Sequence, residues 1–182
     1  IWEHIPNQKL FFNNIKKLLD KKHIIYIEVP DCKKLIENFD YSMIWEEHCY
    51  YYNQQNLIEQ LQILGLKKIK FLRVPHPQED NLCVLLNINY KKKPRIIVNK
   101  NLENNSAFFL EKFNAKKKQT KMFFSKLRKK GFEFSFFGAS HMLNTFLNVY
   151  RLKKYSDYII DENPKKINKF FSDSESKIIS FD

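Results

Sequence analysis

The chain of 182 residues is 43% hydrophobic and 15% aromatic, which is enough apolar material for a buried core and excludes a disordered chain. Its formal net charge of +12 would suit a nucleic-acid partner. However, the abundance of Lys, Asn, Ile, Phe and Tyr, whose codons are AT-rich, explains the charge without one. No apolar run reaches the roughly 18 residues of a membrane span, so no membrane partner is expected. The cysteines form no C-x-x-C pair, which favours a reducing cytoplasm over disulfides or a structural zinc site.

Helices and strands alternate in the first third of the chain. Residues 8–22 predict a helix capped by Asn7, and residues 23–30 form a near-continuous apolar run that predicts a buried strand closed by Pro30. The apolar stripe that we expect to face the core consists of Leu10, Phe11, Ile15, Leu18 and Leu19. A helix followed at once by such a strand indicates an α/β sheet.

A further helix and a strand pair follow. Residues 53–64 predict a helix whose repeat of leucines faces inward. The inward leucines are expected to be Leu57, Leu61 and Leu64, with Gly65 as the C-cap. Residues 67–74 and 81–90 predict two strands, and the turn-prone "PHPQED" between them favours an antiparallel hairpin.

The polar segment 91–105 predicts a linker between two domains, residues 1–90 and 106–182. Residues 106–130 predict one long helix that ends at Gly131. Beyond it come "FEFSFF" as a strand, "GAS" as a tight turn, "HMLNTFLNVYRL" as a helix and "SDYIID" as a strand. This order is typical of a βαβ unit, the core of a Rossmann-like half.

The stretch "MIWEEHCYYYN", residues 43–53, concentrates side chains that can carry chemistry. A neutral imidazole such as that of His48 can take up a proton and return it near neutral pH, and the neighbouring carboxylate of Glu47 can orient it. A metal site is not expected, because H-x-x-x-H and C-x-x-C partners are missing. Covalent catalysis by Cys49 lacks an identifiable base. From the residues alone, a histidine satisfied by a hydrogen bond beside packed aromatic rings is the favoured interpretation.

Motifs along the chain carry a family resemblance. "HIPNQKLFFNNIKKLLDKKHIIYIEVPD" resembles the closing portion of class I S-adenosylmethionine-dependent methyltransferases. "IYIEVPDCKKLIENFDYSMIWEEHCYYYN" resembles the sugar C-methyltransferase family, in which a strand "V-E-V-P-D" precedes "D-x-I-x-x-E-H-x-x-Y-(F/Y)-(S/T)". Near the end, "FFGASHMLNTFLN" and "DYIIDENPKK" are similar to that family's small-residue turn and its "D-x-N-P-x-K" strand exit. The resemblance therefore runs over nearly the whole chain.

The resemblance implies an α/β fold: the C-terminal half of a class I methyltransferase sheet, followed by a Rossmann-like βαβ domain. It also implies a reaction. Such enzymes remove a proton from the carbon alpha to the keto group of a nucleotide-linked sugar, and that carbon then takes the methyl group of S-adenosylmethionine. The expected cofactor is S-adenosylmethionine, the expected partner is a small nucleotide-linked sugar, and the expected location is the cytoplasm. We expect the glycine-rich cofactor loop to lie upstream, so that this chain is an inactive piece of a longer protein.

Site residues follow from the same motifs. The resemblance makes His48 the general base and Glu47 its orienting or substrate-contacting carboxylate, and it places Glu3 and His4 beside the cofactor. The residues implied for substrate binding are Tyr51, Trp45, Gly138, Ala139, Ser140, Asp161 and Asn163. A purely structural alternative exists for the last five, since a small-residue turn permits close helix packing and Asx side chains cap loops.

Two other classes of function stay open at this point. A basic nucleic-acid-binding module needs aromatic rings interleaved with Lys or Arg on an exposed face, whereas the aromatic residues here fall mainly in apolar runs. A non-catalytic methyltransferase-like protein would keep the fold as a surface for assembly. Loss of the upstream cofactor-binding glycine loop would indicate this class, and its presence would indicate an enzyme.

Overall fold

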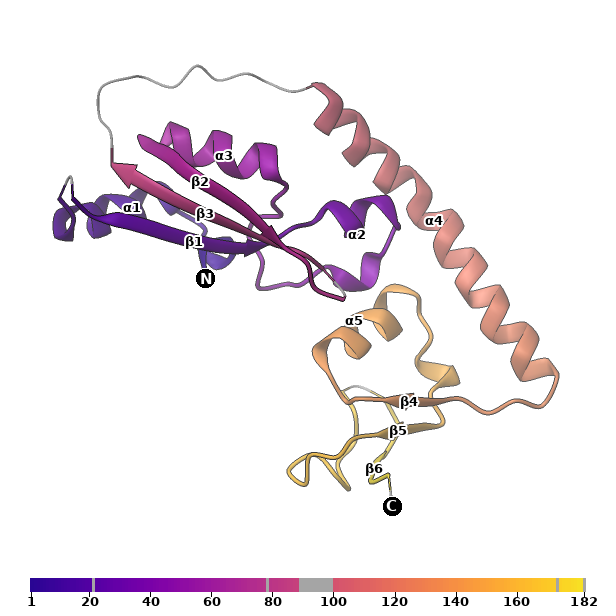
Figure 1. The fold of residues 1–182 in the computed structure, drawn as a ribbon. Coiled ribbons are helices and arrows are strands. Elements are labelled where there is room, and N and C mark those ends of the chain that lie inside the picture. The colour runs from indigo at the N-terminus through magenta and orange to yellow at the C-terminus, as the bar shows by residue number, and fades with distance from the viewer. Residues whose placement is uncertain (21, 78, 89–99, 173, 182) are drawn as a thin grey trace. The chain divides into compact units, whose positions relative to one another are not determined.

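The structure is a computed structural model that describes most of the chain. The described residues are 1–20, 22–77, 79–88, 100–172 and 174–181, with the side chains of all but Lys68 and residues 100–106. Packing divides the chain into two units, each with its own hydrophobic core (Figure 1). Unit 1 consists of Ile1–Asn38 and Glu46–Ser106, and unit 2 of Phe39–Trp45 and Ala107–Asp182.

Unit 1 is built on an antiparallel sheet with the strand order β1-β3-β2. Its strands are β1 (Ile24–Pro30), β2 (Leu66–Val74) and β3 (Asn81–Ile88). The middle strand β3 runs antiparallel to both neighbours, so that Val84 lies opposite Ile27 on one side and Phe71 on the other. The predicted hairpin of the two later strands is confirmed, and β1 and β2 consequently run parallel to each other.

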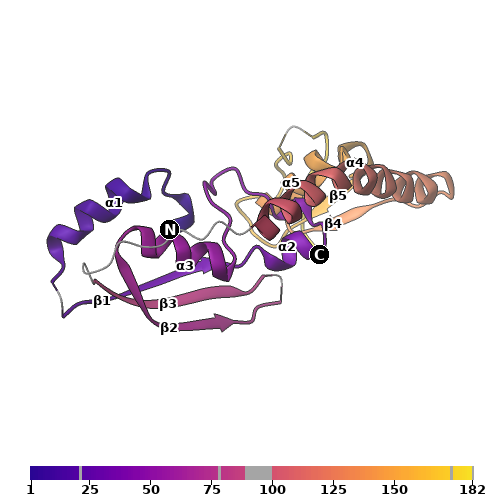
Figure 2. The same cartoon turned by 90° about the horizontal axis from the view of Figure 1, so that it is seen from above.

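Helices cover one face of this sheet. They are α1 (Gln8–Ile15) and α3 (Gln54–Ile63). Unit 1 also contains the short helix α2 (Lys33–Glu37) and the 3₁₀ turns η1 (Trp2–His4) and η2 (Lys16–Leu18). Figure 2 shows α1 and α3 on the same side of the strands. Between them lies the core of unit 1, which consists of Trp2, Phe12, Ile27, Val29, Tyr52, Leu57, Leu61, Leu66, Leu82, Val84, Leu86 and Ile88. The predicted inward leucines of α3 are confirmed, and Gly65 ends the helix at a φ of +83°.

The inward stripe predicted for the first helix is correct only in part, since Leu19 packs against the core but other members do not. Phe12, which was not in that stripe, is 3% exposed, whereas Leu10 and Leu18 are 57% and 79% exposed. Helix α1 passes into a 3₁₀ turn at Lys16, so an apolar period read over residues 8–22 does not describe one regular helix. The cap is confirmed, because Oδ1 of Asn7 accepts a hydrogen bond from the main-chain N–H of Leu10 at 3.0 Å.

Strand β1 is half-buried rather than buried. Ile27 and Val29 point into the core, while Ile24 and Tyr26 are 64% and 56% exposed. This alternation is what an antiparallel sheet shows when helices cover one of its faces. Because nearly every residue of the strand is apolar, the sequence does not show which side chains face the core and which face solvent.

Unit 2 contains the predicted βαβ unit. Strands β4 (Ser135–Phe137) and β5 (Tyr158–Ile160) are parallel, and α5 (His141–Val149) lies between them in sequence. Strand β6 (Ile178–Ile179) pairs in parallel with β5 and completes the order β4-β5-β6. The βαβ unit is confirmed, whereas β6 was not predicted, because two residues carry no periodic signal.

Helix α4 (Lys100–Lys129) is longer than predicted. It begins before Ser106, inside the segment predicted to be a linker, because residues 100–105 contain no Gly or Pro that would interrupt a helix. The rest of that segment, 91–99, lies outside the described residues, so the domain boundary drawn there stays a prediction. None of the helices among the described residues is both long and apolar enough to cross a membrane.

Aromatic rings form much of the core of unit 2. The ring of Phe124 in α4 lies 4.8 Å from that of Phe134 and 5.7 Å from that of Tyr155. The buried members of this core are Tyr41, Ala139, Leu147, Tyr150, Leu152, Tyr155, Ile159, Phe171 and Ile178. All three cysteines of the chain are free thiols, two of them buried and Cys49 exposed.

Candidate functional site

In unit 1, η1 lies against the segment that contains His48. The main-chain N–H groups of Cys49 and Tyr50 donate to the carbonyl oxygen of Glu3 at 2.8 and 3.2 Å. Nδ1 of His4 lies 3.0 Å from the carbonyl oxygen of Glu47 and donates to it, since a carbonyl can only accept. The structure thus brings Glu3 and His4, predicted from one motif, next to Glu47 and His48, predicted from another.

Gln8, at the first position of α1, holds these segments in place. Its Nε2 donates to the carbonyl oxygen of Trp2 at 2.7 Å and to the hydroxyl of Tyr52 at 2.6 Å, and its Oε1 accepts from Gln60. Gln8 is only 3% exposed, so these bonds satisfy a buried amide. Burial also raises the pKa of Tyr52 to about 12, so its hydroxyl stays protonated. A single polar residue at a helix start carries no sequence signal for such a role.

Glu3, His4 and His48 form a cluster. A carboxylate oxygen of Glu3 and one ring nitrogen of each histidine all lie within 4.8 Å of one another. The two imidazole rings meet edge to face, with 4.7 Å between their centroids and 82° between their planes. Glu3 is 7% exposed, and its Oε1 lies 3.6 Å from Nε2 of His4. The cluster therefore places a buried carboxylate beside two imidazoles.

The electrostatics of the cluster favour a neutral His48. Burial lowers the pKa of His48 below its ordinary value of 6.5, and the charge of His4 lowers it further. The carboxylate of Glu3 acts in the opposite direction without reversing the shift. At neutral pH the unprotonated imidazole consequently dominates, and this is the form that accepts a proton.

Glu47 contacts the cluster through its main-chain carbonyl oxygen. Its side chain is exposed, and its carbonyl oxygen is the group that receives the hydrogen bond from His4. Its charge raises the pKa of His48 less than that of Glu3 does. The carboxylate within reach of the His48 imidazole is therefore Glu3, which the resemblance placed beside the cofactor. An orienting role for Glu47 stays a prediction.

Tyr51 lies beside the same imidazole. Its ring is half-buried, with 5.7 Å between its centroid and that of His48. Its carbonyl oxygen accepts from Nδ2 of Asn56 at 3.1 Å, which ties it to the start of α3.

A separate groove of about 550 Å³ in unit 1 is lined mainly by polar side chains of α1 and α3, and the cluster residues do not line it.

The small-residue turn after β4 has a structural role of its own. Gly138 takes a φ of +91°, which favours glycine, and its N–H donates to the carbonyl of Ile160 at 2.7 Å. Ser140 caps α5, since its Oγ accepts from the N–H of Leu143 at 3.2 Å. These contacts join the ends of β4 and β5 to the start of α5.

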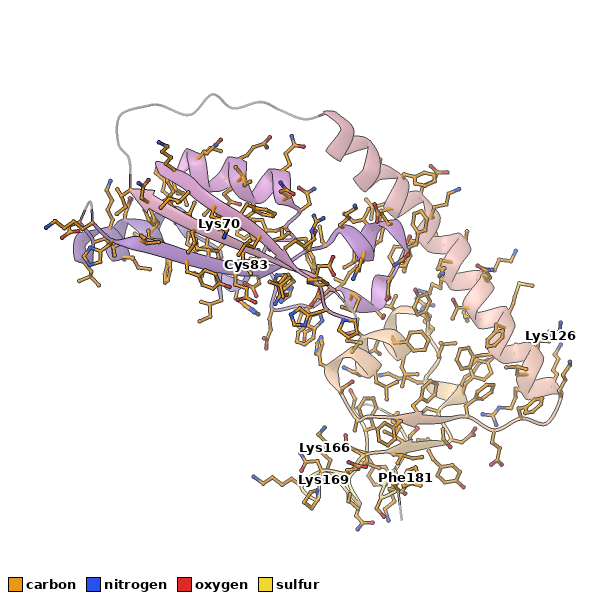
Figure 3. All side chains as sticks on the ribbon, viewed as in Figure 1. Lys70, Cys83, Lys126, Lys166, Lys169 and Phe181 are labelled. Carbon is orange, nitrogen blue, oxygen red and sulfur yellow. The ribbon has the colours of Figure 1, made fainter. Side chains whose placement is uncertain are left out.

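Asp161 locks this turn together. Its Oδ2 accepts from the N–H of Ala139 at 2.8 Å and from Nζ of Lys166 at 2.9 Å, while its Oδ1 accepts from the N–H of Asn163 at 2.8 Å. Lys166, labelled in Figure 3, also donates to the carbonyl of Ala139 at 2.9 Å. The ammonium of Lys166 is the main reason that the pKa of Asp161 lies below its usual 3.8. These contacts support the structural alternative, in which the Asp161 side chain caps the loop. Substrate binding by these residues stays a prediction.

Trp45 belongs to unit 2 and not to the unit of His48. Its ring lies 4.5 Å from that of His141, the first residue of α5, with 38° between the planes. Nε2 of His141 is in turn 3.2 Å from Oγ1 of Thr145. The structure therefore groups Trp45 with the Gly138–Ser140 turn. Lys166 and His141 were not singled out in the sequence, because neither stands at a spacing typical of a known site.

Comparison with known proteins bears on unit 2. Residues 99–181, just under half of the chain, match the model of a family described as the C-methyltransferase C-terminal domain. A search of curated proteins gave no match. The matched segment contains the βαβ unit and the Gly138–Ser140 turn, whereas the Glu3–His4–His48 cluster lies outside it. The match supports a C-methyltransferase family for this protein.

Proposed function

We propose that this chain is part of an S-adenosylmethionine-dependent C-methyltransferase in which His48 is the general base. The acceptor is a carbon alpha to a keto group of a nucleotide-linked sugar or a similar small molecule. The observation that carries the proposal is the juxtaposition of an imidazole of lowered pKa with a buried carboxylate, in a chain whose other unit matches a C-methyltransferase domain.

The proton transfer follows from the state of His48. The neutral imidazole nitrogen takes the proton from the alpha carbon, the C–H bond breaks, and its electron pair forms an enolate with the keto oxygen. The imidazolium that results carries a positive charge, which the carboxylate of Glu3 stabilises at close range. The enolate carbon then takes a methyl group, and S-adenosylmethionine supplies that group when it is bound.

The residues of this chain suit the cofactor only in part. The carboxylate of Glu3 can accept hydrogen bonds from the cofactor's amino or hydroxyl groups. The one glycine of unit 1, Gly65, serves as a helix C-cap and not as part of a loop between a strand and a helix. We therefore assign to this chain the proton transfer and not a complete cofactor site.

Substrate contacts are proposed for both units. In unit 1, the ring of Tyr51 beside His48 would exclude water from the reacting carbon. In unit 2, the Gly138–Ser140 turn lies where the carboxyl end of β4 meets the start of α5, the usual position of ligands in open parallel sheets. Trp45, packed on His141, would add an aromatic surface there for the nucleotide.

The test uses the full-length protein that contains this sequence, with a nucleotide-linked keto-sugar as substrate. His48→Ala is expected to lower turnover by about 10²–10⁴-fold, the usual contribution of a general base. Exchange of the alpha proton for deuterium in D2O, followed by NMR, reports the base directly and should fall in parallel.

The matched control is His23→Ala, since His23 is exposed and pairs with Asp20 away from the cluster. This variant should keep both rates. Unchanged exchange and turnover in His48→Ala would remove His48 from the mechanism, whereas loss of both in His23→Ala would show a non-specific effect.

A further inference from the structure

We propose that Glu3, His4 and His48 bind a divalent transition metal of the zinc type. Residue spacing did not indicate this site, because its ligands come from two distant segments that the fold brings together. The inference goes beyond the proposed methyltransferase function, and metal binding does not depend on that function.

The ligand atoms are close enough to share one ion. They lie within 4.8 Å of one another. Bonds of about 2.0–2.2 Å to a tetrahedral zinc would place them about 3.3–3.5 Å apart, so shifts of about an ångström in the side chains complete the site. The main chains that carry them are already joined by hydrogen bonds from Cys49 and Tyr50 to Glu3.

The hydrogen bonding of His4 prepares it to be a ligand. Its Nδ1 donates to the carbonyl of Glu47, and this bond fixes the tautomer in which a neutral His4 has its lone pair on Nε2. Ligating histidines in metal sites usually donate their other nitrogen in this way. Nε2 faces Oε1 of Glu3 at 3.6 Å, so two electron-rich atoms meet where the carboxylate is largely buried and the imidazole is about one-third exposed. A cation between them, either a proton or a metal ion, removes the repulsion.

The ligand types select the class of metal. Two imidazoles and one carboxylate suit zinc and its neighbours among the transition metals. Mg²⁺ and Ca²⁺ prefer sites made of oxygen ligands and are not expected here. Three protein ligands would leave a fourth position open for water or another small ligand. A metal on His48 also occupies the lone pair that a general base needs, so metal binding should compete with the proposed reaction, a consequence that rests on the proposed function.

The test is a titration of the metal-free protein with Zn²⁺ by calorimetry and with Co²⁺ by visible absorption, without substrate. One ion per chain should bind, and His4→Ala or His48→Ala should each weaken the affinity by about 10–100-fold or more. His23→Ala and Cys49→Ser serve as controls for an exposed imidazole and the exposed thiol, and both should bind as the unchanged protein does.

NMR of the unchanged protein covers the case in which a variant fails to fold. On addition of Zn²⁺, the ring nitrogens of His4 and His48 should shift together, while those of His23 should not. Absence of saturable binding, equal affinity in His4→Ala and His48→Ala, or shifts confined to other histidines would each overturn the proposal. Because no substrate is present, these outcomes are independent of the success or failure of the methyl-transfer assay.

Discussion

Gln8 helps to hold the main-chain segments around His48 in place. The amide of Gln8 links Trp2, Tyr52 and Gln60, and in this way it fixes η1 beside the segment that carries the imidazole. A buried amide that loses one of these partners leaves an unsatisfied polar group, which costs about 1–3 kcal/mol. The reacting groups are thus positioned by a residue that touches none of them directly.

The lowered pKa of His48 predicts a pH dependence of both function and stability. If His48 acts as a base, the acidic limb of kcat/KM should have its midpoint below pH 6.5, because burial and the charge of His4 favour the neutral imidazole. The unfolded chain takes up this proton near its ordinary pKa, and the folded chain does so only at lower pH. Stability should therefore fall as the pH drops from about 6.5 through the lowered pKa.

An NMR titration of the imidazole protons gives the pKa of His48 directly, and the variant His48→Gln identifies its signal. The same variant should remove the matching part of the pH dependence of thermal unfolding. A pKa at or above 6.5 would show that Glu3 outweighs burial, and it would contradict the electrostatic account of the site.

Single-residue prediction from the sequence reached the residues that a motif names and was limited where proximity decides the role. Glu3, His4 and His48 were all predicted as site residues, but their contact could not be read from spacing, since it depends on main-chain pairing of distant segments. For the same reason the sequence pointed to Glu47, the neighbour in the chain, whereas the structure places Glu3 at the imidazole.

At the scale of elements, an ion pair joins the end of α4 to the sheet of unit 2. Nη2 of Arg128 lies 2.8 and 2.7 Å from the two carboxylate oxygens of Asp157, which also accepts from the N–H of Phe134 at 2.7 Å. The guanidinium carbon lies 5.3 Å from the centroid of the Phe134 ring. Burial raises the pKa of Asp157, but the hydrogen bonds from Arg128 and Phe134 outweigh it and lower the pKa overall.

Replacing Arg128 should therefore destabilise unit 2. Arg128→Ala is expected to lower the free energy of unfolding by about 1–2 kcal/mol, less than a fully buried pair would, because both side chains are about one-third exposed. Urea denaturation measures the change. Lys126→Ala is the matched control, since Lys126 is exposed on the same helix (Figure 3), and its effect should stay within about 0.5 kcal/mol. Equal effects of the two substitutions would show that the ion pair does not stabilise the unit.

The helices and strands show which sequence signals were sufficient. The leucines of α3, the hairpin and the βαβ unit were predicted correctly because each depends on a local period, a turn or a short-range order of elements. The facing of α1 and the half-burial of β1 were not, because they depend on what packs against each element. Phe12 is buried in the core cluster of unit 1, whereas Leu10 is exposed. The apolar spacing of residues 8–22 does not predict this difference.

At the scale of the whole molecule, the order of residues in the sequence differs from their grouping in space. Phe39–Trp45 belongs to unit 2 although the residues on both sides of it belong to unit 1. Tyr41 explains why: its ring lies 4.4 Å from Phe109 and 4.9 Å from Phe113, and its hydroxyl donates to the carbonyl of Phe109 at 2.5 Å. A composition-based boundary cannot detect such an exchange, because the segment resembles its neighbours in polarity.

The net charge of +12 also acts at this scale, and it gives the test of the competing nucleic-acid function. Some aromatic rings of unit 2 are exposed, with Phe123 at 59% and Phe137 at 67%. Other rings, such as that of Phe124, pack against the core. We therefore expect no continuous surface on which successive bases could stack. The protein should bind a single-stranded oligonucleotide only non-specifically, with a Kd of about 10⁻⁴–10⁻⁶ M at physiological salt. Fluorescence anisotropy at increasing salt measures this, with an uncharged polymer as control. A submicromolar Kd that depends on base sequence would contradict the charge-only account and favour nucleic-acid recognition over methyl transfer.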